Sequence, residues 1–571
     1  MVQVETVAPA IAPEAERHET EPRWSAPAPA PTPVAPAPSR VTAPRPSLRT
    51  LLAGPLGVVL VALVAGLFAT WYSASHDLLL LYGDARSHLT IARRLIDGPN
   101  AGIVQLGTVW LPLPHLLLVP FVESRWLWHT GLAAIPVGLA CLAIEALSVY
   151  SIVGTVGGSR RARWIAVLVF VTNPSLLYLH TTALTEPVLF AAMLTTVATL
   201  ARWATAEKAY SGGEIAVFCG LPATAAVLSR YDGWAFVVAA AAFVVFVAWR
   251  RWGSLRYALH VARCFVALPV IAGAWWMWFN WVNFGDPLEF QRGQYSAQAQ
   301  QALLAAEGHL PEQHNLGVSL TTYSTSVLRG AGWLVVACAL FGMVAWLWRR
   351  RFTVRTLAPW LLVAVPFGFY VASLYTGQAA LRLDPTATDS MFNLRYGVEM
   401  LAGLAVFAGL GASVMLDRVD RLHRPWLGVV ATGAIVVLVG AQAAAWWPDH
   451  DRVPVVEEGL AQRAAGAGQY AAAEWLREHA RDDGLLLIDD SVNPVLPVIN
   501  TNFDRVAAPF SGPRWHDALI DPSRATWVYV DVANPGDDVA AAIARDPWFR
   551  RDFDLVFAQG GAEVYRRRGN S

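Results

Sequence analysis

Residues 51–73, LLAGPLGVVLVALVAGLFATWYS, indicate the fold class. This stretch carries no charged residue and exceeds the ~20 residues that an α-helix needs to cross a lipid bilayer. Similar apolar blocks recur along the 571-residue chain, in which 55% of the residues are hydrophobic and 15% are charged. A soluble protein of this length needs a more highly charged surface. The blocks therefore predict a mainly α protein with a polytopic transmembrane domain.

The segment before this first apolar run has a different composition. Residues 1–48 are rich in proline and alanine (APAPAPTPVAPAPSR), and such a low-complexity tail is predicted to be disordered. Arg40, Arg45 and Arg49 lie just ahead of the run, which starts too far from the N-terminus for an ordinary signal peptide. We expect a retained helix whose N-terminus is cytoplasmic.

The breaks between the later apolar blocks alternate in charge. Every second break holds a cluster of basic residues, and the others are longer and richer in Asp, Glu, His and Pro. The positive-inside rule places the basic breaks in the cytoplasm. Counting along residues 49–447 then predicts about eleven spans, with the C-terminus outside. The basic breaks contain Arg160, Arg161 and Arg163; Arg202 and Lys208; Arg250, Arg251 and Arg256; Arg349, Arg350, Arg351 and Arg355; and Arg418, Arg421 and Arg424.

Residues 448–571 have the composition of a small soluble domain. An amphipathic helix is predicted for 470–480, and buried strands for 485–489 and 526–532. Residues 553–558 and 563–566 predict a hairpin around Gly560 and Gly561. We expect an extracytoplasmic α/β domain, in which no nucleotide-binding fingerprint is found.

The balance of charge argues against a nucleic-acid partner, and the positions of the cysteines argue against disulfides and a cysteine metal site. The 43 basic and 43 acidic residues balance, so no overall field favours nucleic acid. The four cysteines, at 141, 219, 264 and 338, all fall inside apolar runs. They form neither a disulfide framework nor a Cys-x-x-Cys metal site.

The first outer loop is the most informative segment for function: LYGDARSHLTIARRLIDGPNAGIVQLGTVWLPLPHLLL, residues 81–118. Its apolar residues recur at helical spacing from Ala85 to Ile96, with Arg86 and Arg93 on another face. This pattern predicts an amphipathic helix in the plane of the membrane surface. Asp84 begins that helix. It is either an N-cap or a general base placed to take a proton from an acceptor hydroxyl.

Four further outer segments contain ionisable residues at the ends of predicted spans. Such residues are costly at membrane depth and are usually functional, paired, or both. One interpretation is a structural clamp in which Arg230 pairs with Asp232 or Glu186. The other is a site, because all these groups belong to one side of the bilayer. The segments are NPSLLYLHTTALTEPVLF (173–190), with His180 and Glu186; LSRYDGW (228–234), with Arg230 and Asp232; FGDPLEFQRGQYSAQAQ (284–300), with Asp286 and Tyr295; and MFNLRYGVEM (391–400), with Arg395, Tyr396 and Glu399.

In their order and sidedness, Asp84 and these segments resemble the GT-C superfamily of membrane glycosyltransferases. The likeness spans roughly residues 50–447 and is closest to the protein O-mannosyltransferase and aminoarabinose-transferase branch. It implies transfer of a sugar from a polyprenyl-phosphate carrier to an acceptor outside the cytoplasm, with inversion. The family's loop aspartate corresponds to Asp84, and its phosphate-contacting arginine to Arg395 or Arg230. Ala85 follows Asp84 where many members have a second acid, which leaves a divalent-metal requirement open.

The remaining side chains near Asp84 suggest substrate contacts. Tyr396 and Trp110 are suited to stacking on a sugar, although aromatic residues at an interface also serve as anchors. His88 and His115 suit an acceptor; each is a lone histidine without a partner at ligand spacing, so no metal and no cofactor is predicted. With Asp84 as the base, the predicted substrate-binding residues are Arg86, His88, Trp110, His115, Glu186, Arg230, Asp232, Asp286, Tyr295, Arg395 and Tyr396.

The sequence is also compatible with two other functions. A transporter or flippase of a lipid-linked substrate would place its charged groups near the membrane midplane and would often show internal repeats, which are not evident here. A non-catalytic scaffold would leave the outer carboxylates dispersed. For the glycosyltransferase, we expect a multi-pass protein of the cell membrane with its active side outside. Which sugar is moved, and whether a lipid, a glycan or a protein accepts it, does not follow from the residues.

Overall fold

The computed structural model describes residues 53–569 apart from 294–295, 307, 309, 351–352, 384–390, 447–448 and 481, and apart from the side chains of 297, 300, 303 and 425. The predicted tail, residues 1–48, and the candidate site residue Tyr295 lie outside the described residues.

The chain is a multi-pass membrane protein. Within the described part of the chain, nine helices are long and apolar enough to cross a membrane. They are α2 (Pro55–Ser75), α6 (Ile135–Thr155) with the turn before it, α9 (Glu186–Thr205), α12 (Asp232–Trp252), α13 (Leu255–Phe284), α17 (Trp333–Arg350), α18 (Leu361–Thr376) with the turn before it, η6 and α19 (Leu394–Met400 and Leu401–Asp420), and α20 (Pro425–Ala444).

Two of the eleven predicted spans are shorter than this criterion. The third corresponds to α7 (Arg160–Val171), and the fifth to the run Gly212–Val227, which comprises α10, η3 and α11. The mainly helical fold is confirmed, and the count of eleven stays a prediction. The other helices of this part are α8 (Pro174–Leu179), α14 (Glu289–Arg292), α15 (Ala297–Ala306) and α16 (Leu316–Ala331).

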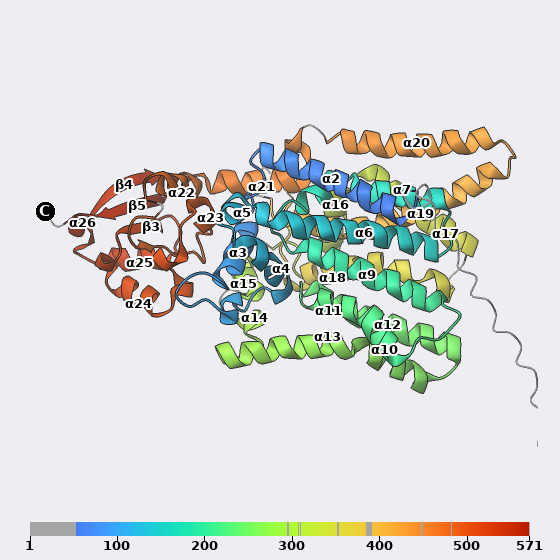
Figure 1. The fold of residues 1–571 in the computed structure, drawn as a ribbon, viewed down its shortest axis with the longest axis horizontal. Helices are drawn as coiled ribbons and strands as arrows, with labels where there is room; N and C mark the ends of the chain where they lie inside the picture. The colour runs from blue at the N-terminus through green and yellow to red at the C-terminus, as the bar shows by residue number, and fades with distance from the viewer. Residues whose placement is uncertain are drawn as a thin grey trace, which may run out of the picture. The chain divides into compact units, whose positions relative to one another are not determined.

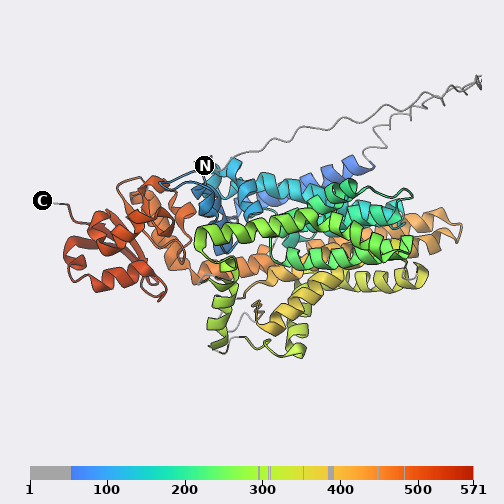
Figure 2. The same cartoon turned by 90° about the horizontal axis from the view of Figure 1, so that it is seen from below.

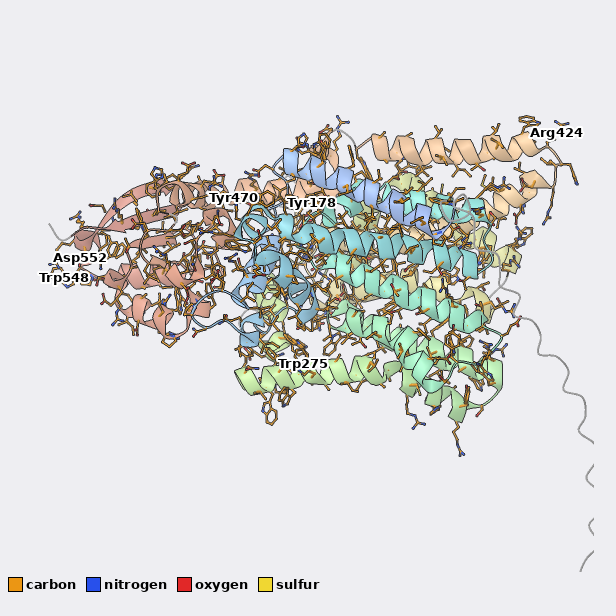
Figure 3. The ribbon with its side chains drawn as sticks, in the orientation of Figure 1. Tyr178, Trp275, Arg424, Tyr470, Trp548 and Asp552 are labelled. Carbon is orange, nitrogen blue, oxygen red and sulfur yellow. The ribbon has the colours of Figure 1, made fainter. Side chains whose placement is uncertain are left out.

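The basic breaks and the intervening breaks lie at opposite ends of the helix bundle. At one end, Arg251 donates to the carbonyl of Trp203 (2.8 Å), and Arg349 lies 2.8 Å from Asp417. Figure 3 shows Arg424 at this end and Tyr178 at the other, where the C-terminal region begins. Successive breaks therefore alternate between the two ends of the bundle, as their charges predicted. Which end faces the cytoplasm stays a prediction.

A layer of short helices covers the end opposite the basic residues. It contains α3 (Gly83–Arg94), η1 (Ile103–Leu106), α4 (Pro112–Val122) and α5 (Arg125–Thr130), between the bundle and the C-terminal region (Figure 1). The helix predicted in the first loop is confirmed as α3, and its placement in the plane of the membrane surface stays a prediction. The apolar residues Ala85, Leu89 and Ala92 are fully buried, whereas Ile96, predicted on the same face, lies beyond the end of α3 and is 45% exposed. The arginine face is also covered, with Arg86 6% and Arg93 9% exposed. Helix α3 is therefore enclosed by protein on both faces.

The C-terminal region begins with α21 (Pro454–Ala465) and α22 (Ala467–His479) and contains a five-stranded mixed sheet of order β2-β1-β3-β5-β4. Strand β1 (Leu486–Leu487) runs parallel to β2 (Val506–Ala507) and β3 (Trp527–Asp531), whereas β4 (Phe553–Gln559) and β5 (Ala562–Arg567) form the predicted antiparallel hairpin. The helices of this region include α23 (Leu496–Ile499), α24 (Pro513–Ile520), α25 (Asp538–Arg545) and α26 (Phe549–Asp552).

The η6–α19 segment is the centre of the bundle. It is almost wholly buried, whereas α20 packs on the outside with little of its surface covered. Figure 2 shows the same arrangement from below, with the C-terminal region at one end of the helices. Because η6 starts this central helix at the covered end of the bundle, its side chains meet those of α3 and of the first turns of α9 and α12.

Candidate active site

Four segments far apart in the sequence bring their charged residues together at the covered end of the bundle. Asp84 lies in the first turn of α3, Glu186 is the first residue of α9, and Asp232 is the first residue of α12. Arg395 lies in η6. Glu186, Asp232 and Arg395 lie at helix starts because the apolar sequence after each of them enters the bundle. Asp84 instead begins one of the short helices that cover this end.

Arg395 is the central group of this cluster. Its guanidinium forms an ion pair with Asp84, and its Nε lies 3.1 Å from Oε1 of Glu186. The Arg395 side chain is 6% exposed, whereas that of Asp84 is 41% exposed. Within the described residues, Nη1 of Arg395 has no hydrogen-bond partner. The pair therefore combines a reachable carboxylate with a buried cation that has an N–H group to spare.

Arg230 extends the cluster on the other side of Glu186. Its Nη1 donates to Oε1 of Glu186 (2.9 Å) and to the hydroxyl of Thr185 (3.1 Å), and its Nε donates to Oδ2 of Asp232 (3.1 Å). The pairing that the clamp interpretation predicted for Arg230 is present, with both Glu186 and Asp232, and the role of the pairing stays a prediction. A continuous row of alternating charges runs from Asp84 through Arg395, Glu186 and Arg230 to Asp232.

Tyrosine rings enclose this row. Tyr396 stacks on Tyr370 with ring centroids 4.7 Å apart, and the Arg230 guanidinium lies 5.6 Å from the Tyr396 centroid. The Tyr370 hydroxyl donates to Oδ2 of Asp232 (2.8 Å). The ring of Tyr82 lies 5.3 Å from the Arg395 guanidinium. Aromatic faces next to both arginines strengthen cation binding and limit access of water.

The first-loop carboxylate is ionised at neutral pH. Burial on its own raises the pKa of Asp84, but Arg395, with help from His88 and Arg230, holds that pKa below its ordinary value. Asp84 Oδ2 is occupied by Arg395, and no described residue donates a hydrogen bond to Oδ1. Asp84 is not an N-cap either, because α3 starts at Gly83 and its cap position, Tyr82, makes no side-chain capping bond. Its carboxylate is directed into the site.

His88 and His115 form a pair, which corrects the interpretation of each as a lone histidine. Their Nδ1 and Nε2 atoms lie 2.9 Å apart, both rings are buried, and His88 lies edge-on to Trp110 at 4.7 Å between centroids. Sequence spacing could not reveal this because α3 and α4 meet only in the fold. Among the described residues no group of three His, Cys, Asp or Glu side chains could hold a metal ion. The predicted absence of a cofactor stays a prediction.

Of the other predicted residues, Arg86 and Asp286 also lie apart from the charged row, and Tyr295 lies outside the described residues. Arg86 donates to the carbonyls of Pro494 and Leu80 (2.8 Å each), so it ties the first loop to the C-terminal region. Asp286 accepts from the backbone N–H of Leu288 (2.8 Å) within its own loop. Tyr295 is not described. Substrate contacts by these three residues remain predictions.

Sequence reasoning missed several residues of the site. Tyr82 and Tyr370 contact the charged row, and Glu399, named only as a charged residue, lies beside Asp232 and Tyr370. The only signal for Tyr370 was a hydroxyl inside an apolar span, which must find a partner in the bundle. A hydroxyl alone does not say which partner.

The fold and the charged row define a multi-pass membrane protein with a polar site at one end of its bundle. Comparison with solved structures shows similarity to ArnT from Cupriavidus metallidurans bound to undecaprenyl phosphate, with a TM-score of 0.55, 14% identity, and coverage of 90% of this chain and 98% of ArnT. The apo state of ArnT gives a TM-score of 0.51 at the same identity and coverage. This chain therefore has the fold of ArnT, in line with the resemblance of its motifs.

A weaker similarity extends to an oligosaccharyltransferase. The archaeal AglB from Archaeoglobus fulgidus, in complex with an inhibitory peptide and a dolichol-phosphate, gives a TM-score of 0.43 at 13% identity, over 90% of this chain and 74% of that one. No protein-family model matches the chain, and no curated protein matches it.

Proposed function

We propose that this protein is a glycosyltransferase that moves a monosaccharide from a polyprenyl-phosphate donor to an acceptor on the extracytoplasmic side, with inversion at the sugar. The observation that carries the proposal is the ion pair between the reachable carboxylate of Asp84 and the buried guanidinium of Arg395. The ArnT fold supports it, because the ArnT structure contains undecaprenyl phosphate.

The chemistry needs a base and a cation at neighbouring positions. The acceptor hydroxyl attacks the anomeric carbon from the face opposite the phosphate, and Asp84 takes its proton. The bond between that carbon and the phosphate oxygen breaks, and the electron pair stays on the polyprenyl phosphate. Arg395 stabilises the charge that develops there, since a planar guanidinium binds two phosphate oxygens at once.

The ion pair seen between Asp84 and Arg395 suits a site without substrate. A donor phosphate that engages Arg395, beginning with its unpartnered Nη1, would compete with Asp84 for the guanidinium. Loss of that pairing would raise the pKa of Asp84 and make it a stronger base. Glu186, which contacts both arginines, would keep the two cations in place during this exchange.

The location of the row favours transfer over transport. Its charged residues lie at helix starts at one end of the bundle, where a lipid phosphate would be at headgroup level, and a transporter would place them near the midplane. A scaffold would leave Asp84 and Arg395 far apart, yet they are in contact. We therefore prefer the enzyme to either alternative.

The proposal is tested by Asp84→Asn in membranes supplied with a labelled polyprenyl-phosphate sugar. We expect transfer to fall about 10²–10⁴-fold, because the isosteric amide cannot accept the proton. Asp483→Asn, on an exposed turn of the C-terminal region, is the matched control and should transfer at the original rate. Undiminished transfer by Asp84→Asn would remove the assignment of the base.

A further inference from the structure

Glu458 is a wholly buried carboxylate outside the charged row. It lies on α21, the first long helix of the C-terminal region, and none of its surface is exposed. Its Oε1 accepts the backbone N–H of Asn393, and its Oε2 accepts that of Leu394, both at 2.8 Å. Gln462, one turn further along α21, donates to Oε1 at 3.3 Å. A carboxylate this deeply buried needs such partners.

The two N–H groups belong to the residues immediately before Arg395. They lie at the start of η6, where the backbone N–H groups have no partner within their own helix. Asn393 is held in the left-handed region (φ 62°), which is sparsely populated for residues other than glycine. Its side chain is fixed as well, since Nδ2 donates to the carbonyl of Ala380 (2.9 Å). The backbone that aims Arg395 is thus set by an acceptor on another part of the chain.

The same helix also reaches the segment that carries Asp84. The hydroxyl of Tyr82 donates to the carbonyl of Val455 on α21 (2.6 Å). Tyr82 directly precedes the first turn of α3, and its ring lies against Arg395. One turn of α21 therefore contacts both sides of the Asp84–Arg395 pair.

We propose that Glu458 is a positioning residue that fixes the η6 backbone so that Arg395 meets Asp84 and the donor phosphate. This inference rests on the proposed function and gives the C-terminal region a part in it. A contact that only docked the C-terminal region onto the bundle would not need to involve the backbone next to Arg395. Glu458 instead binds the two amides next to the guanidinium-bearing residue.

The ionisation of Glu458 offers an independent readout. Burial raises the pKa of Glu458 to about 7, although Arg395 and the two backbone N–H groups oppose this effect. The charged and titratable groups that face it are Arg395, Tyr82 and Tyr178. Below this pH the carboxyl gains a proton and loses acceptor strength toward one N–H. The hold on η6 should then loosen.

The direct test is hydrogen–deuterium exchange of the full chain in lipid nanodiscs. In Glu458→Gln one oxygen becomes an NH2 group that cannot accept, so peptides covering 391–400 should exchange about tenfold faster. Glu478→Gln, an exposed glutamate on α22, is the matched control and should exchange as the original chain does. Unchanged protection at 391–400 in Glu458→Gln would overturn the proposal.

The activity measurement separates positioning from simple loss of structure. Glu458→Gln should lower kcat about tenfold with the acceptor KM unchanged. In the original chain kcat should fall as the pH drops below about 7, and in Glu458→Gln this acid limb of the pH profile should be absent. Equal kcat and the same acid limb in both proteins would refute the role of Glu458. Failure of the original chain to transfer any sugar would instead refute the proposed function. The hydrogen–deuterium exchange result would still test whether Glu458 fixes the η6 backbone.

Discussion

Arg395 keeps a charge in a buried place because carboxylates on two sides compensate it. An isolated guanidinium removed from water is costly, and its cost is repaid by Asp84 and by Glu186 at 3.1 Å. The face of Tyr82 adds a cation–π contact. These contacts leave Nη1 without a partner among the described residues. The Arg395 guanidinium is therefore held in one position with a free N–H donor, an arrangement suited to binding an anion such as a phosphate.

At this residue we predict that Arg395→Lys weakens donor binding and turnover together. Lysine keeps the charge but cannot bridge two phosphate oxygens, so kcat/KM for the donor should fall about 10²-fold. Calorimetry with undecaprenyl phosphate alone should show weaker binding. Arg545→Lys, an exposed arginine on α25, serves as the control and should leave both quantities unchanged. Equal affinity in Arg395→Lys would mean that the phosphate binds elsewhere.

Helices α3 and α4 are joined by the pair His88–His115. His88 on α3 and His115 on α4 share one hydrogen bond of 2.9 Å, and both rings are buried away from water. Burial lowers the pKa of His88 from 6.5 to about 4. The ring is therefore neutral at neutral pH, and the pair can consist of one donor and one acceptor.

From this pair we predict a stability loss on acidification. The folded-state pKa of His88 lies below the unfolded value, so the folded chain binds fewer protons between about pH 6.5 and 4. Its contribution is full above pH 6.5 and is lost as the pH falls toward 4, by on the order of 3 kcal/mol. The melting temperature in detergent should fall over this range, and His88→Asn should show a shallower fall. Parallel curves would contradict the prediction.

Across the whole molecule, charge is sorted to the two ends of an apolar bundle. The basic breaks contact one another at one end, as in the 2.8 Å pair of Arg349 with Asp417, while the Asp84–Arg395 row lies at the other. The C-terminal region packs over the end that carries the row (Figure 1). The positive-inside rule then predicts that the row and the C-terminal region are extracytoplasmic.

This orientation predicts the outcome of cysteine labelling in intact cells. With the native cysteines replaced by alanine, Ala541→Cys on α25 should react with a membrane-impermeant maleimide. Lys208→Cys, in a basic break, should react only after permeabilisation. Both positions are exposed, so reactivity reports sidedness and not burial. The reverse pattern would place the site inside the cell and remove the proposed acceptor side.

The amino-acid sequence was sufficient to predict the apolar helices, the two sets of breaks between them, and the types of residue in the row. The length of each apolar segment and the charge of the loops beside it are local properties, and they determine whether that segment inserts into a membrane and in which orientation. They located the span ends at which Asp84, Glu186, Arg230, Asp232 and Arg395 were named, together with other ionisable residues, and the family resemblance suggested roles for Asp84 and Arg395. The hairpin of β4 and β5 was likewise local, because its two strands are adjacent in the chain.

Which of these groups touch one another depends on how the helices pack. Arg395 meets Asp84 across 311 positions of sequence, and His88 meets His115 through the packing of two helices. Glu458 gave no signal, because a glutamate in a soluble helix is ordinarily solvated, and it became a ligand of η6 only through burial against the bundle. Pairing across such distances depends on the relative placement of helices, which periodicity and composition do not encode.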